Sequence, residues 1–103
     1  MVVYLSGINY ETNKQELERL KANLFDLGCT IITPEAKELD KLIWSENVRL
    51  RLSFLQSSST IYMLPNWKES AMARIELTAA MNEKMPLCFS PNDIRELITT
   101  LDR

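Results

Sequence analysis

Residues 59–80, STIYMLPNWKESAMARIELTAA, decide the fold, because a strand, a turn and a helix follow one another directly. The run 59–64 is rich in β-branched and aromatic residues, which is typical of a buried strand, and Pro65 ends it. The stretch after the turn has apolar residues at helical spacing and predicts a helix over 69–83. A strand that leads into a helix in this way is typical of α/β proteins.

The same alternation continues on both sides of this stretch. Short apolar runs predict three further strands, at 2–6, 29–33 and 86–89. Apolar residues at helical spacing predict three further helices, with stripes from Leu17 to Leu27, from Trp44 to Leu55 and from Ile94 to Leu101. Residues 35–42 have room for a short helical turn.

This order, strand and helix four times over, predicts one α/β domain over residues 1–103. We expect a small flavodoxin-like, doubly wound fold, with a four-stranded parallel sheet in the order 2-1-3-4 and helices on both faces. Asn13 with Glu16 three residues later resembles a capping box, and Gly28 and Pro91 mark the end and the start of helices.

Composition excludes several classes of function. The net charge is −2 and the basic residues are scattered, which argues against a nucleic-acid-binding surface. No apolar run approaches the roughly 20 residues that span a membrane, and the start of the chain lacks the features of a signal peptide, so we expect a cytoplasmic protein. The chain has two cysteines and no histidine, which predicts free thiols, no zinc site and no histidine-dependent triad.

Glycine content limits the ligand. The chain has only Gly7 and Gly28, so it contains neither of the glycine-rich motifs that hold dinucleotides or triphosphates. A smaller ligand, a nucleoside or its monophosphate, fits better, and we expect no cofactor. In an open parallel sheet it would bind at the carboxyl ends of the strands, where the strand order reverses. The loops 6–12 and 65–70, which contain Ser6, Asn9 and Asn66, should meet there.

Glu76 is the most unusual residue of the predicted 69–83 helix. Its neighbours three and four residues away on that helix are all apolar: Met72, Ala73, Ala79 and Ala80. A buried carboxylate without a partner is costly, so a partner from elsewhere in the fold is expected. Glu76 is then either half of a structural pair at a packed interface or a residue of a functional site.

Four segments of the chain carry a family resemblance: VYLSG, GCTIITPEA, IYMLPNWKES and ARIELTAA. They resemble the nucleoside 2-deoxyribosyltransferase-like family, in particular a small branch found in phages and bacteria that is related to deoxynucleoside monophosphate N-hydrolases. The resemblance covers nearly the whole chain, and its most specific part is the pattern LP-x-W-x-x-S-x-x-A-x-x-E.

The resemblance implies roles for particular residues. It places Glu76 on the family's nucleophile, which attacks the anomeric carbon of deoxyribose, and Ser70 on a phosphate contact of the related hydrolases. It also matches Gly7 to the glycine of the first-strand loop and Trp67 to a tryptophan of the closest branch. Arg51 and Ser59 stand at positions that are often acidic in the family. The family's usual candidate for the general acid that protonates the leaving base is therefore missing.

Structural interpretations compete with these roles. Arg51 is either a surface residue with an extended side chain or a partner for Glu76 or a ligand phosphate. Trp67 either anchors its turn or stacks on a base, as does Tyr10, for which packing in the loop is favoured. Ser70 is a candidate helix cap, a role that is compatible with anion binding.

The predicted helices contain more apolar residues than one buried stripe needs. The surplus residues belong either to a broad two-sided core or to a dimer interface; they are Trp44, Leu50, Phe54 and Met72. The resemblance favours a homodimer.

The preferred function is an N-glycosidic transferase or hydrolase that acts on a nucleoside or nucleotide, with Glu76 as nucleophile. The alternatives are a non-catalytic nucleotide-binding module and a structural interaction protein.

Overall fold

The computed structural model describes residues 1–8, 12–33 and 41–101. Its strands are β1 (Val2–Ser6), β2 (Thr30–Ile32), β3 (Thr60–Met63) and β4 (Leu87–Cys88). Its helices are α1 (Lys14–Asp26), α3 (Trp44–Gln56), the short 3₁₀ helix η1 (Trp67–Glu69), α4 (Ala71–Asn82) and α5 (Pro91–Leu101). None of these helices combines the length and the apolar character needed to cross a membrane. The predicted turn at 35–42 falls largely outside the described residues.

The four strands form one parallel sheet in the order β2-β1-β3-β4, as predicted. In the central pair, Val3 lies opposite Thr60 and Tyr4 opposite Ile61. β2, β3 and β4 are each two residues shorter than the apolar runs that predicted them. At the end of β3, the pairing with β1 cannot continue beyond Leu64, because Pro65 has no N–H to donate to a neighbouring strand.

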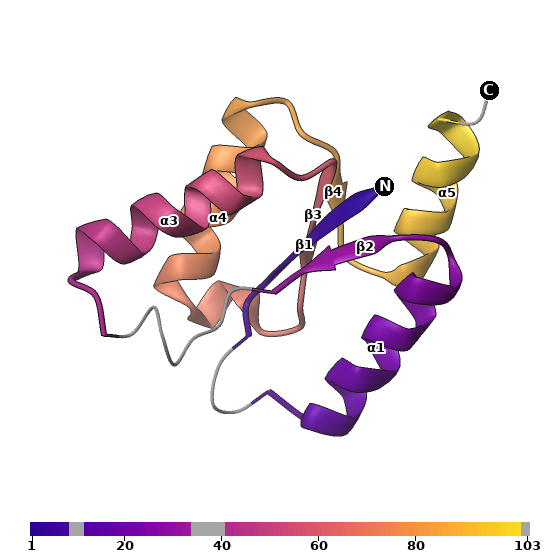
Figure 1. The fold of residues 1–103 in the computed structure, drawn as a ribbon, viewed down its shortest axis with the longest axis horizontal. Helices are drawn as coiled ribbons and strands as arrows, with labels where there is room; N and C mark the ends of the chain where they lie inside the picture. The colour runs from indigo at the N-terminus through magenta and orange to yellow at the C-terminus, as the bar shows by residue number, and fades with distance from the viewer. Residues whose placement is uncertain (9–11, 34–40, 102–103) are drawn as a thin grey trace.

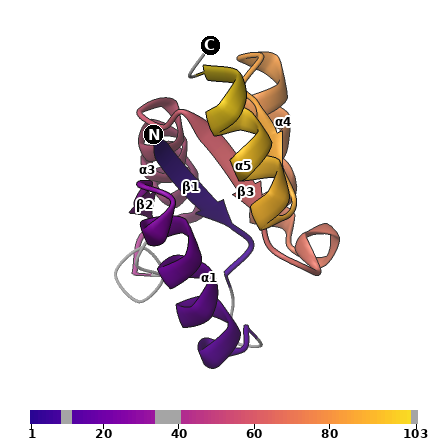
Figure 2. The ribbon, with the colours of Figure 1, turned by 90° about the vertical axis from the view of Figure 1, so that its right-hand side faces the viewer.

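Helices cover both faces of the sheet, with α1 and α5 on one side and α3 and α4 on the other (Figures 1 and 2). Side chains alternate along β1, so Val3 and Leu5 join the core under α1 and α5. Tyr4 points the other way and joins the core under α3 and α4. The first strand therefore contributes to both cores, and its residues Tyr4 and Ser6 face α4.

The helix ends follow from local sequence. The Asn13 side chain accepts hydrogen bonds from the backbone N–H groups of Gln15 and Glu16 at the start of α1. Gly28 follows the end of that helix with a φ of +85°, a conformation that glycine adopts at little cost. At α5, Ser90 accepts from the Asp93 N–H while the Asp93 carboxylate accepts from the Phe89 N–H.

The outer surface of α3 bears on the prediction that its surplus apolar residues belong to a two-sided core. A two-sided core within one chain would bury Trp44, Leu50 and Phe54, but these side chains are 56%, 41% and 42% exposed. Only the side that faces the sheet packs inward, through Leu52 and Leu55. The two-sided core is therefore wrong for the single chain, because the sheet offers α3 just one surface to pack against.

Candidate functional site

Glu76 is buried between α4 and the sheet, and its side chain is only 1% exposed. Both of its carboxylate oxygens accept hydrogen bonds from β1. The Tyr4 hydroxyl donates to Oε2, and the Ser6 hydroxyl donates to Oε1 at 2.8 Å. These donors precede Glu76 by 72 and 70 residues, so the partners absent from its own helix come from the first strand.

The geometry follows from two simple periodicities. Tyr4 and Ser6 are two residues apart on a strand, so their side chains leave the same face of the sheet. Glu76 lies one turn after the buried Ala73 and one turn before the buried Ala80, so it occupies the middle of the α4 face that contacts the sheet. Small alanines on either side let the helix approach closely enough for the carboxylate to reach both hydroxyls.

Burial dominates the electrostatics of this cluster. It raises the pKa of Glu76 above its ordinary value, because a charge in a medium of low polarity is poorly solvated. The hydrogen bonds from Tyr4 and Ser6 and the positive charge of Arg51 act in the opposite direction. Burial also raises the pKa of Tyr4, and the neighbouring charge of Glu76 raises it further. Tyr4 therefore remains a hydrogen-bond donor across the physiological pH range.

Arg51 turns toward this cluster from α3. Its Nε donates to the side-chain oxygen of Asn47 at 2.7 Å, and Asn47 is itself only 6% exposed. The charge of Arg51 lowers the pKa of both Glu76 and Tyr4, although no ion pair joins Arg51 to Glu76 in the described part of the chain. Arg51 is thus oriented by a buried amide, and the direct pairing with Glu76 considered from the sequence is not formed.

The first and third strands lead into loops that meet, as predicted. Leu64 N–H donates to the Ser6 carbonyl at 3.0 Å, which continues the pairing of β1 and β3 beyond β3 itself. Gly7 has a φ of +99°, and a Cβ at that position would stand 3.6 Å from the Trp67 side chain. Gly7 therefore lets the backbone turn beside the Trp67 side chain at the carboxyl edge of the sheet.

The turn after β3 is a compact unit. Asn66 adopts a left-handed conformation, with a φ of 69°, and leads into the short helix η1. Trp67 packs against Phe89 with ring centroids 6.2 Å apart, and the Lys68 ammonium lies 5.7 Å from the Trp67 ring centroid. The anchoring role considered for Trp67 is therefore present, and stacking on a base stays a prediction.

Ser70 forms the predicted cap of α4, where its hydroxyl accepts from the Ala73 N–H at 3.1 Å. Its contact with a phosphate stays a prediction. Asn9 and Tyr10 lie outside the described residues. Of the other candidates, Ser6 and Arg51 are brought to Glu76, whereas Gly7, Asn66, Trp67 and Ser70 line the turn where β1, β3 and α4 meet.

Sequence reasoning missed Tyr4 and Asn47. Tyr4 looked like an ordinary core residue of a buried strand, although its two-residue spacing from Ser6 was a usable signal. Asn47 is the one polar residue at a buried position of α3, four residues before Arg51, which places both on one face of that helix. In the described segments, no group of carboxylates and cysteines is arranged to hold a metal ion.

The chain was also compared with known proteins. The model of a family described as "Domain of unknown function (DUF4406)" matches residues 1–89. No curated protein and no solved structure matches the chain.

Proposed function

Because the chain belongs to the DUF4406 family, a domain of unknown function, we propose its function from the cluster that Tyr4, Ser6 and Arg51 form around Glu76. The protein cleaves or transfers the N-glycosidic bond of a nucleoside or nucleotide, with Glu76 as the nucleophile on deoxyribose. The observation that carries this proposal is the orientation of Glu76, whose two oxygens are each held by a hydroxyl of β1. A carboxylate fixed in this way is suited to attack at a sugar carbon.

Three groups around Glu76 favour the ionised form that a nucleophile needs. The two hydroxyl donors and the positive charge of Arg51 lower its pKa, although burial is the larger effect and raises the pKa overall. In the reaction, an oxygen of Glu76 forms a bond to the anomeric carbon while the bond to the base breaks. Water or a second base then displaces Glu76. With a side chain 1% exposed, the cluster has to open before a substrate can reach it.

The second candidate is a nucleotide-binding module without turnover. It is favoured by the groups that act on Glu76, which are Tyr4, Ser6 and Arg51 and include no second carboxylate among the described residues. The leaving base must be protonated, and an arginine cannot serve as the acid near neutral pH. In this candidate, Arg51 binds a phosphate group of the ligand instead.

Base release separates the two candidates. The wild type, Glu76→Gln and the control Glu83→Gln, an exposed residue at the end of the same helix, are incubated with the four deoxynucleoside monophosphates. Free base is measured by chromatography and binding by calorimetry. We expect release by the wild type and the control, and binding without release by Glu76→Gln, since the amide keeps the shape and loses the charge. Binding without release in all three proteins would favour the module, and a wild type that does neither would contradict both candidates.

We also propose that the protein is a homodimer formed through α3. Ile43, Leu50 and Phe54 are exposed and recur at intervals of seven and four residues, which places them on one stripe of the helix. An apolar stripe of this kind on a small chain is typical of a surface that a second copy covers. Arg51 borders the same stripe, so a partner chain would lie close to the Glu76 cluster.

A further inference from the structure

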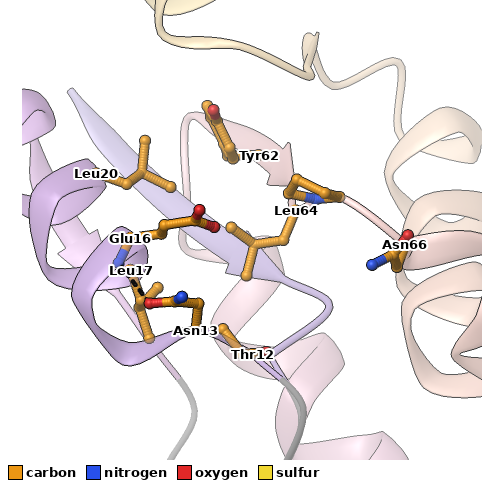
Figure 3. A pocket seen from close by; sticks show the side chains of 9 residues that line it. Thr12, Asn13, Glu16, Leu17, Leu20, Tyr62, Leu64 and Asn66 are labelled. Atoms are coloured by element: carbon orange, nitrogen blue, oxygen red, sulfur yellow. Dashed lines mark hydrogen bonds between the residues drawn. The ribbon is translucent and has the colours of Figure 1, made fainter.

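A cavity of about 300 Å³ opens between α1 and the end of β3 (Figure 3). Its apolar wall includes Leu17, Leu20, Tyr62 and Leu64. Tyr62 and Leu64 belong to the core under α1 and α5, whereas Tyr4, which binds Glu76, belongs to the core on the other face of the sheet. The cavity is therefore separate from the Glu76 cluster.

Glu16 is the charged residue of this cavity. Its side chain extends from α1 into the cavity toward Leu64 (Figure 3). In a complete capping box this carboxylate would accept a hydrogen bond from the Asn13 N–H. Only the other half of the box is present in the described part of the chain, where Asn13 accepts from the Gln15 and Glu16 N–H groups.

The charge of the cavity has one sign. Among the described residues, Glu16 forms no ion pair, and those that line the cavity include no lysine or arginine. The start of a helix usually attracts anions, but here the N–H groups of Gln15 and Glu16 already donate to the Asn13 side chain. A negatively charged ligand would therefore meet a carboxylate beside a cap whose Gln15 and Glu16 N–H groups are already in use.

We propose that this cavity is a second small-molecule site, for an organic cation that combines a flat apolar body with one ammonium or amidinium group. The body lies against Leu17, Leu20 and Tyr62, where it displaces water from apolar surface. The charged nitrogen donates hydrogen bonds to the Glu16 carboxylate, and the Asn66 side chain lies on the opposite side of the cavity (Figure 3). The volume is at the lower end of the range for small-molecule sites.

Benzamidine is a suitable probe, because its neutral and anionic counterparts, benzamide and benzoate, have nearly the same shape. Each compound is titrated into the uniformly ¹⁵N-labelled protein while amide NMR signals are recorded. We expect benzamidine to shift the signals of Leu17, Leu20 and Tyr62 saturably, with a dissociation constant on the order of 1 mM. Benzamide should bind about tenfold more weakly, and benzoate should not bind, because only the amidinium forms a charge-assisted hydrogen bond.

Two variants of α1 test whether the Glu16 carboxylate is the group that binds the amidinium. Glu16→Gln should weaken benzamidine binding about tenfold and leave benzamide binding unchanged. Glu18→Gln removes the same charge from the same helix, but Glu18 pairs with Lys21 on the surface and does not line the cavity. It should therefore bind benzamidine as the wild type does. The proposal is overturned if benzamidine causes no saturable shifts at the cavity, if the three compounds bind equally, or if both variants weaken binding to the same extent.

Discussion

Replacing Tyr4 with phenylalanine should destabilise the protein, and more at pH 8 than at pH 5. The substitution removes the hydroxyl that donates to Glu76 Oε2 and leaves the ring in place. A hydrogen bond to a charged group contributes about 1.5–3 kcal/mol, whereas one between neutral groups contributes about 0.5–1.5 kcal/mol. The expected loss is therefore about 2–3 kcal/mol when Glu76 is ionised and about 1 kcal/mol when it is protonated.

The sign of the pH dependence follows from burial. The pKa of Glu76 is raised in the folded protein, so this residue supports folding most fully below its ordinary value of 4.5. That contribution is lost as the pH rises through the raised pKa. The Tyr4 hydroxyl holds the pKa down, so in Tyr4→Phe the pKa rises further and the loss of stability continues to higher pH.

Urea unfolding at pH 5 and pH 8 measures this difference, with the fluorescence of the two tryptophans as the signal. Tyr62→Phe is the matched control. Tyr62 is also buried in the sheet, but it faces the opposite core and makes no side-chain hydrogen bond within the described residues. We expect the control to lose little stability at either pH. An equal loss for Tyr4→Phe at both pH values, or a loss no greater than that of the control, would show that Glu76 does not depend on the Tyr4 hydroxyl.

Three further predictions concern other parts of the molecule. Leu50→Glu should convert the proposed dimer to a monomer in light scattering, whereas Phe25→Glu, at a more exposed apolar position on α1, should not; a wild type that is monomeric at micromolar concentration would contradict the dimer. Gly7→Ala should lower the stability by about 1–2 kcal/mol in thermal melts, because a side chain is strained at positive φ, and an unchanged melting temperature would refute this. The thiols of Cys29 and Cys88, whose pKa values burial raises, should react with a disulfide reagent at pH 8 only after denaturant is added; rapid reaction of the folded protein would show that they are accessible.

The fold could be predicted because its signals are local. Each strand or helix is marked by residues within it or next to it. These signals are the apolar runs, the helix caps at Asn13 and Ser70, and Gly28 at the end of a helix. The alternation of strands and helices then leaves few arrangements for a parallel sheet. Strand lengths were less accurate, because apolar residues such as Leu64 stay buried although they lie beyond the last residue of the strand.

The site could be predicted only in part, since its contacts are long-range. Glu76 stood out because a carboxylate among apolar neighbours needs a partner. The sequence offered no means of choosing that partner, and a basic residue was as plausible as two hydroxyls. Tyr4 was hidden because a tyrosine suits a buried strand whether or not its hydroxyl is used. The direction of Arg51 depends on Asn47, which is buried only in the folded chain.

The place of β1 in the sheet has a consequence for synthesis on the ribosome. β1 is made before the other strands of the sheet, yet it lies between β2 and β3, and its partner β3 ends at Met63. The hydroxyls of Tyr4 and Ser6 gain their hydrogen-bond acceptor later still, after Glu76 has been made and α4 has docked. A nascent chain that stops before α4 would expose an apolar strand edge and two unsatisfied polar groups. We therefore expect this domain to fold only after α4 has been made, with chains truncated before α4 prone to aggregation or in need of a chaperone.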